Sequence, residues 1–168
     1  HTRRRQGRPL HADGHVARKI TAALPFDLTP GQHKVRDEIT TDMASDAAMT
    51  RLLQGDVGSG KTVIAMLAMA DAVEAGAQAA FMAPTELLAR QHAKVLRNLA
   101  AAAGLRLALL TGRERGAERD EILDRLKQGD IDILVGTHAL FQEGVEFRDL
   151  GLVIIDEQHR FGVHQRLA

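Results

Sequence analysis

Several residue types are absent or scarce in this chain of 168 residues, and each shortage excludes a class of protein. Cysteine is absent, which excludes disulfide scaffolds, thiolate metal sites and a cysteine nucleophile. Tyrosine and tryptophan are also absent, so binding of nucleic acid by stacking bases on aromatic rings is not expected. No apolar run is long enough to span a membrane, and the N-terminus lacks the apolar core of a signal peptide. The remaining composition, with 45% hydrophobic and 26% charged residues, is typical of one globular domain.

Charge is balanced overall but uneven along the chain. Residues 1–20 carry six Arg or Lys and one acid, Asp13, so they hold a charge of +5 and the rest of the neutral chain holds −5. A basic nucleic-acid surface must therefore be local or lie outside this chain. Residues 1–24 have no clear hydrophobic period, and we expect a linker from a preceding domain, with a short helix near 16–24. The start at His1 rather than at Met favours a piece of a longer protein.

From residue 25 the sequence alternates between helical periodicity and short apolar runs. Thr29 is the expected N-cap of a helix, with Pro30 at the first helical position and Gln32 placed to complete a capping box. Further helices are predicted at 61–75, 86–103 and 117–128, and strands at 49–54, 77–83, 105–110, 131–135 and 152–155. This alternation predicts an α/β fold in which helices flank a parallel sheet. The carboxyl ends of all its strands then meet at one edge, where such sheets bind ligands.

The segment after the first strand matches the phosphate-loop pattern G-x-x-x-x-G-K-[ST] at every position. It comprises Gly55, Asp56, Val57, Gly58, Ser59, Gly60, Lys61 and Thr62. Glycines let consecutive backbone N–H groups face one anion, and the following helix adds the positive end of its dipole. We expect Lys61 to reach the β- and γ-phosphates of a nucleotide, and the Thr62 hydroxyl to ligate Mg²⁺. The alternative is an ordinary glycine-rich turn, which the flanking strand and helix argue against.

Two acids, Asp156 and Glu157, follow the last apolar strand. Carboxylates at the end of a buried strand are costly unless they meet cations. Asp156 is expected to hold Mg²⁺ through water, and Glu157 to polarise a water molecule for attack on the γ-phosphate. Taken alone, such a pair is equally consistent with the acidic start of a helix. The complete phosphate loop in the same chain favours the catalytic interpretation.

Longer strings resemble the first RecA-like motor domain of superfamily 2 helicases, and among these the RecG-type helicases of branched DNA. The strings lie at residues 24–26, 54–62, 82–86, 136–140 and 156–163, and the resemblance covers residues 20–168. Transcription-repair coupling translocases are similar over the motor, but Ser59 and Gln158 favour the RecG type. The resemblance implies a RecA-like P-loop NTPase domain over residues 25–168 that uses ATP and Mg²⁺.

The resemblance also implies roles for residues outside the phosphate loop. Phe26 and Gln32 match the segment that contacts adenine, although the capping box explains Gln32 equally well. Thr85, Gly112 and Thr137 match positions that contact the backbone of one DNA strand. For Thr85 the alternative is a helix cap, and for Gly112 an ordinary turn after a strand.

Residues after the acid pair complete the implied site. Gln158 and His159 match the link between the nucleotide state and the loops on the DNA side. The role of Arg160 and Phe161 in this family does not follow from the sequence. The other histidines are not paired with acids at a spacing typical of metal ligands.

The resemblance implies a motor that remodels replication forks and Holliday junctions in DNA repair and recombination. A second RecA-like domain with its arginine fingers, and a wedge domain, are expected as partners in the parent chain, so residues 1–168 alone should hydrolyse ATP poorly. We also expect a monomer in the bacterial cytoplasm, associated with the nucleoid. The alternatives are a coupling-translocase motor, a phosphate-loop switch or kinase, and a non-catalytic interaction domain. Intact Lys61, Thr62, Asp156 and Glu157 argue against the last of these.

Overall fold

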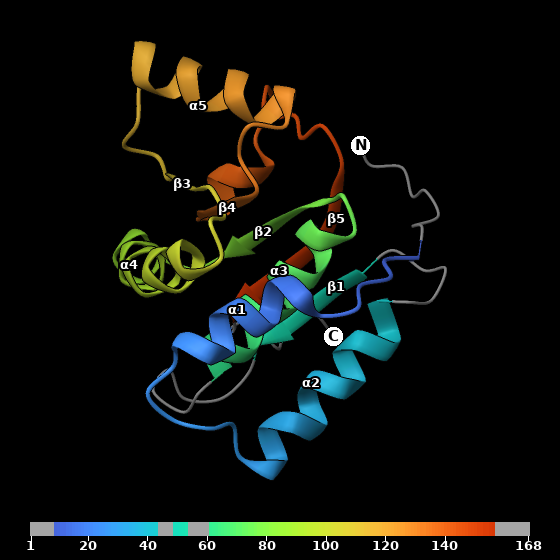
Figure 1. The fold of residues 1–168 in the computed structure, drawn as a ribbon. Helices are drawn as coiled ribbons and strands as arrows, with labels where there is room; N and C mark the ends of the chain where they lie inside the picture. The colour runs from blue at the N-terminus through green and yellow to red at the C-terminus, as the bar shows by residue number, and fades with distance from the viewer. Residues whose placement is uncertain (1–8, 44–48, 54–60, 157–168) are drawn as a thin grey trace, which may run out of the picture.

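A parallel sheet with helices on both faces forms the frame of this protein in a computed structural model that describes residues 9–43, 49–53 and 61–156 (Figure 1). Its elements in chain order are α1 (His15–Ala23), α2 (Pro30–Met43), β1 (Met49–Leu53), α3 (Lys61–Glu74), β2 (Gln78–Met82), α4 (Glu86–Ala102), β3 (Leu107–Leu110), α5 (Gly116–Gln128), β4 (Ile133–Gly136), the 3₁₀ helix η2 (His138–Phe141) and β5 (Leu150–Asp156). The predicted α/β fold with a parallel sheet is confirmed, whereas η2 was not predicted.

The strands lie in the order β1-β5-β2-β4-β3, and every neighbouring pair is parallel. β2 is the central strand, and both β2 and its neighbour β4 are almost wholly buried. The last described strand in sequence, β5, lies between β1 and β2, so it brings its acidic last residue next to the strand that precedes the phosphate loop. Covered strands of this kind are apolar on both faces, which explains why they were recognisable as continuous apolar runs.

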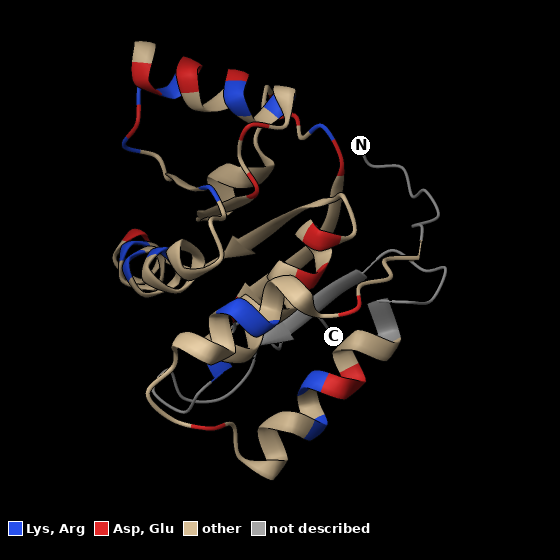
Figure 2. Ribbon diagram, in the orientation of Figure 1, with Lys and Arg blue, Asp and Glu red and all other residues tan. Residues whose placement is uncertain are grey.

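The larger core lies between the sheet and the helices α1, α3 and α4. α3 is buried at every position from Ile64 to Ala72, and Figure 2 shows charged residues only towards its two ends. A helix that is apolar all round must be covered on several sides, and α3 contacts α1, α2 and α4 as well as the sheet. Phe81 on β2 fills the sheet side of this core and is fully buried.

A smaller core lies between the sheet and the elements α5 and η2. It contains Ala80, Leu126, Leu134 and Leu140, all of which are essentially inaccessible to solvent. α5 buries only Leu126 and carries both signs of charge along its length (Figure 2). The helices on the two faces therefore differ, because α3 is enclosed and α5 is largely solvated.

Helix α4 ends just before Gly104, a residue that allows the chain to reverse direction. Gly104 has a φ of 71°, and the N–H groups of Gly104 and Leu105 donate to the carbonyls of Ala101 and Ala100. This is a Schellman motif, which favours glycine at the left-handed position. Because the N–H of Leu105 is still bonded to the helix, β3 begins at Leu107 and not at residue 105 as predicted.

Residues 10–23 pack on the domain. Leu10, Ala17 and Ile20 are buried in the larger core, and α1 contacts α3 and α4. The short helix predicted near 16–24 is confirmed by α1. The boundary between linker and motor domain at residue 24 stays a prediction, but the described part of that segment contributes to the core.

An ion pair joins α2 to α3. The Arg36 guanidinium binds the carboxylate of Asp71 through both terminal nitrogens, at 2.7 and 3.3 Å. Asp71 is buried and Arg36 half-buried, so each charge needs the other. The pair therefore fixes α2, which carries Gln32 in its first turn, against α3, which begins at Lys61.

Candidate functional site

The strand register brings the predicted site residues to one edge of the sheet. Leu53 at the end of β1 pairs with Asp156 at the end of β5, and Met82 on β2 pairs with both Ile155 and Gly136. Gly136 in turn pairs with Leu110 at the end of β3. All five strands thus end side by side, and the segments that follow them share this edge.

The described part of the phosphate loop is its last two residues. Residues 55–60 lie outside the described residues. Lys61 is the first residue of α3, and Thr62, the second, is only 8% exposed. A lysine and a hydroxyl at the start of a helix are placed where the helix dipole favours phosphate.

Asp156 is the buried acid of this edge. It is the last residue of β5 and is 5% exposed. Its Oδ2 lies 2.7 Å from Nε2 of His92, a buried residue of α4. Among the described residues Oδ1 has no hydrogen-bond partner, although a buried carboxylate oxygen needs one. Glu157, Gln158 and His159 lie outside the described residues, so their predicted roles remain predictions.

The donor set suits magnesium. Mg²⁺ is bound by oxygen ligands and keeps several of its waters, and it is usually held by one or two carboxylates together with substrate phosphates. The Thr62 hydroxyl and the Oδ1 of Asp156, which has no partner among the described residues, are oxygen donors of this kind, and both residues are buried. These two residues therefore fit the Mg²⁺ that accompanies ATP.

His92 was missed by sequence reasoning. The inward-facing residues of α4 are Ala89, His92, Ala93, Leu96 and Ala100, so the helical period alone places His92 in the core. A buried imidazole requires a polar partner, which was a detectable signal. The identity of that partner was not detectable, because Asp156 is 64 residues away in sequence.

Gln32 has the capping role that was one of its two interpretations. Its Oε1 accepts from the Thr29 N–H at 2.8 Å, and its own N–H donates to Thr29 Oγ1 at 3.1 Å. The capping box is confirmed. It uses the side-chain oxygen of Gln32, and the side-chain N–H groups have no partner among the described residues. Phe26 is 48% exposed and so is available to a ligand. An adenine contact by these two residues stays a prediction.

The three predicted DNA-side residues lie at the ends of β2, β3 and β4. Thr85 caps α4 by accepting from Leu88 N at 3.2 Å, and Thr137 caps η2 by accepting from Ala139 N at 3.3 Å. Gly112 is exposed in the turn after β3. The capping alternative is therefore confirmed for Thr85. The DNA contacts stay predictions, and backbone N–H groups at such helix starts suit phosphate oxygens.

An ion-pair network fixes the loop after β3 to the start of α4. Glu114 accepts from the Thr111 N–H at 2.6 Å and from its hydroxyl at 3.0 Å, and its other oxygen lies 3.5 Å from Arg90. Glu86 binds both Arg90 and Arg113 at 3.1 Å. Burial acts to raise the pKa of Glu114, but hydrogen bonds, chiefly from Thr111 N–H, outweigh it and hold that pKa below its usual value.

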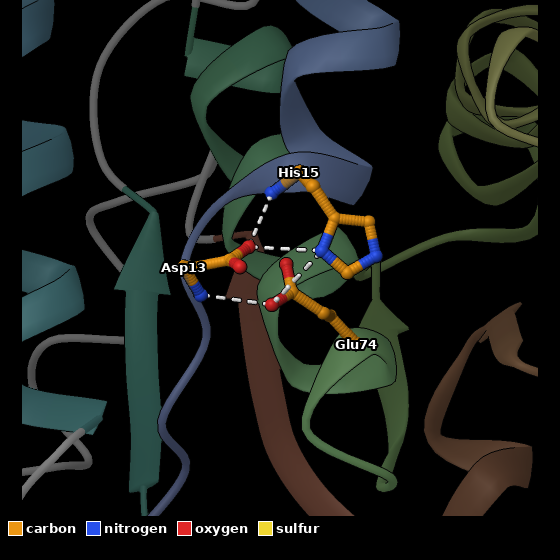
Figure 3. A group of neighbouring side chains, drawn as sticks. All are labelled: Asp13, His15 and Glu74. Carbon is orange, nitrogen blue, oxygen red and sulfur yellow. Dashed lines mark hydrogen bonds and ion pairs between the residues drawn. The ribbon is translucent and has the colours of Figure 1, made fainter.

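A second cluster of acids and histidine lies away from this edge, where α1 meets the end of α3 (Figure 3). The Glu74 carboxylate accepts from the N–H groups of Asp13 and Gly14 at 2.8 and 3.1 Å, so it caps the start of α1. Asp13 accepts from the N–H and from Nδ1 of His15, which lowers the Asp13 pKa. These hydrogen bonds already explain the cluster as a helix cap built from a distant residue.

The site combines a buried acid at the end of β5 with a lysine and a threonine at the start of the helix that follows the neighbouring strand, β1. This combination defines a RecA-like nucleotide-binding motor domain. A family model for DEAD/DEAH box helicases matches residues 29–167, and the chain belongs to this family. Within the described residues, no helix combines the length and apolarity that a membrane crossing needs.

Curated relatives narrow the similarity within the family. The ATP-dependent DNA helicase RecG of Streptococcus pneumoniae is 60% identical over 151 residues, and that of Escherichia coli K12 is 53% identical over 160 residues. These alignments cover 88% and 95% of this chain but 22% and 23% of the relatives. The chain therefore spans about a fifth of the length of these relatives.

A solved structure of RecG bound to a three-way DNA junction superposes with a TM-score of 0.84. The two sequences are 49% identical, and the match covers 93% of this chain and 21% of that one. The predicted resemblance to RecG-type helicases is confirmed, and so is the prediction of a helicase motor domain that uses ATP.

Proposed function

We propose that this chain is the first motor domain of a RecG-type DNA helicase that remodels branched DNA, such as forks and Holliday junctions, in repair and recombination. The observation that carries the proposal is the likeness to RecG, whose structure was solved on a three-way DNA junction. The buried Asp156 and the Lys61–Thr62 helix start supply the ATP side of this activity.

On the nucleotide side, residues 55–62 hold the phosphates, with Lys61 at the β- and γ-phosphates. Thr62 and Asp156 hold Mg²⁺, and Glu157 orients and polarises the attacking water. Bound MgATP supplies the γ-phosphoryl group and the metal charge that offsets its negative charge. Phe26 and the amide N–H groups of Gln32 select adenine. Lys61 and Thr62 begin a helix that is buried along its length, which keeps them in place while the nucleotide reacts.

On the DNA side, Thr85, Gly112 and Thr137 present one surface to a single strand. Their loops follow β2, β3 and β4, which are neighbours in register, and helix-start N–H groups in two of the loops suit phosphate oxygens. Contacts of this kind hold the backbone without reading sequence, as a translocating motor requires. Gln158 and His159 connect these loops to the nucleotide.

The proposed activity needs partners in the same polypeptide. A second RecA-like domain supplies arginine fingers, which are worth on the order of 10³–10⁵ in rate, and a wedge domain separates the strands at a branch. The 168 residues alone should therefore bind ATP but hydrolyse it slowly. We place the motor on the bacterial nucleoid as a monomer.

The test is ATP turnover by the complete polypeptide that contains these residues, without DNA, with single-stranded DNA and with a fork or three-way junction. We expect the branched substrates to stimulate turnover most, and a Glu157→Gln variant to lose that stimulation while still binding nucleotide. Equal rates with every substrate would contradict the helicase proposal and leave a nucleotide-binding domain.

A further inference from the structure

His92 and Asp156 form a buried contact between a helix and a strand end that are far apart in sequence. His92 Nε2 lies 2.7 Å from Asp156 Oδ2, and both side chains are 4% exposed. The imidazole also lies against Phe81, with ring centroids 4.8 Å apart and planes inclined at 53°. The ring is therefore held on one side by a core aromatic residue and at its edge by the carboxylate.

The contact assigns the donor when Asp156 carries the negative charge that a metal ligand needs. An ionised carboxylate can only accept, so Nε2 of His92 is the donor to Asp156. A hydrogen bond to a charged group, with water excluded from both partners, is among the stronger ones in a protein. It leaves Oδ1 as the oxygen of Asp156 that has no partner among the described residues.

An apolar residue would fill the space beside Phe81 equally well, so packing alone does not account for a histidine at this position. A carboxylate that faces a metal rotates about its terminal bond unless one of its oxygens is held. Partners that hold metal-binding side chains typically change metal affinity by roughly 10–100-fold when they are removed. His92 satisfies this description, because it holds Oδ2 and leaves Oδ1 without a partner among the described residues.

We propose that His92 is a positioning residue for the magnesium–nucleotide site, and that it acts by fixing the Asp156 carboxylate in the orientation that holds Mg²⁺. This inference rests on the proposed function, since it assumes that Asp156 holds the metal. It adds a residue of α4 to a site whose predicted members come from the phosphate loop and the acid pair. In this proposal His92 acts only through Asp156 and is not itself a ligand of the metal or the nucleotide.

The experiment measures binding of a fluorescent ADP to the complete polypeptide with Mg²⁺ and with EDTA, so that the ratio of the two dissociation constants reports the metal contribution. We compare His92→Leu, which removes the donor and keeps the bulk, with His92→Gln, whose amide N–H reaches the position of Nε2. His11→Leu is the control, because His11 is exposed and lies away from the edge.

We expect His92→Leu to lower the Mg²⁺ contribution roughly 10-fold or more while binding in EDTA stays within about twofold of the unsubstituted protein. His92→Gln should recover most of the contribution, and His11→Leu should not change it. A purely structural role predicts something different, namely equal weakening with and without Mg²⁺. That result, or an unchanged contribution in His92→Leu, would overturn the inference.

Two further results keep the test decisive. If His92→Leu does not fold, as judged by circular dichroism, His92→Asn replaces it, since its shorter amide cannot reach Oδ2. Asn and Gln variants with the same metal contribution would then reject the inference. If the unsubstituted protein binds ADP no more tightly with Mg²⁺, the metal site of the proposed function fails, and the role of His92 fails with it.

Discussion

The two halves of the strand-end edge are built on different principles. Around β1 and β5 the functional groups are side chains with their own chemistry, namely Lys61, Thr62 and Asp156, and the last two are buried. Around β2, β4 and β3 the threonines cap helices and a glycine occupies the turn, so the groups offered to a ligand are largely backbone N–H groups. In the proposed function, the first half acts on one small ligand, whereas the second holds a polymer at many equivalent positions.

We call the half around β1 and β5 the nucleotide half. The comparison predicts that substitutions there change activity more than stability. Lys61→Ala should lower ATP turnover by about 10²–10³-fold, because it removes one preorganised charge from the phosphates. The free energy of unfolding should change by less than about 0.5 kcal/mol, since Lys61 is half-buried at a helix start and packs no core. Turnover and chemical denaturation of the complete polypeptide measure both quantities. A large loss of stability would remove the distinction between the halves.

The half around β2, β4 and β3, which we call the DNA half, should respond in the opposite way, because substitution of Gly136 should change stability more than activity. A Cβ at this position would meet the backbone oxygen of Leu110, and it would lie 2.7 Å from Leu140 Cδ2. The carbonyl belongs to the paired strand and cannot move without breaking the ladder, so Gly136→Ala should destabilise the fold by about 3 kcal/mol or more.

Chemical denaturation measures the effect of Gly136→Ala. Gly112→Ala is the matched control, because nothing lies within 4 Å of a Cβ there and its φ is not in the left-handed region. Equal stability of the two variants would show that the strands can separate to admit a methyl group.

What could be predicted from the sequence depended on how near each partner lies along the chain. The capping box joins Thr29 and Gln32, which are three positions apart, and it was predicted in full. The phosphate-loop pattern and the apolar strands are local in the same sense, and they sufficed for the fold and for the edge at which ligands bind.

Features that depend on long-range pairing could not be predicted in this way. The hydrogen bond between His92 and Asp156 joins residues 64 apart, and the cap of α1 by Glu74 joins residues about 60 apart. Asp156 was recognisable from the sequence, but neither His92 nor Glu74 shows its partner among its sequence neighbours, and each pairing exists only once the helices pack. Local motifs therefore identify the site, whereas tertiary partners of this kind appear only in the structure.

The next largest effect is expected at Glu114 and depends on pH. Its pKa is lowered in the folded state, so its stabilising contribution is present above the usual carboxyl pKa of about 4.5 and is lost as the pH falls through the folded value. Glu114→Gln should cost about 1–2 kcal/mol at pH 7, because the charge-assisted bonds from Thr111 become neutral ones.

The measurement is the difference in unfolding free energy between the unsubstituted protein and Glu114→Gln from pH 7 to pH 3. We expect that difference to shrink below about pH 4.5, where the protonated glutamic acid resembles glutamine. The other carboxyl groups cancel in the comparison. A difference independent of pH would show that the charge of Glu114 contributes nothing to holding the loop.

The smallest effect is expected at Thr85, where the two halves can be compared most directly. Thr85→Ala removes the acceptor for Leu88 N and should destabilise the fold by about 1 kcal/mol, whereas Thr85→Ser keeps the hydroxyl and should cost much less.

Lys61→Ala should leave DNA affinity in the absence of nucleotide nearly unchanged. If Thr85→Ala weakens DNA binding while Thr85→Ser does not, the hydroxyl orders the N–H groups that contact the strand. If neither variant changes DNA affinity, Thr85 is a helix cap and not a DNA contact.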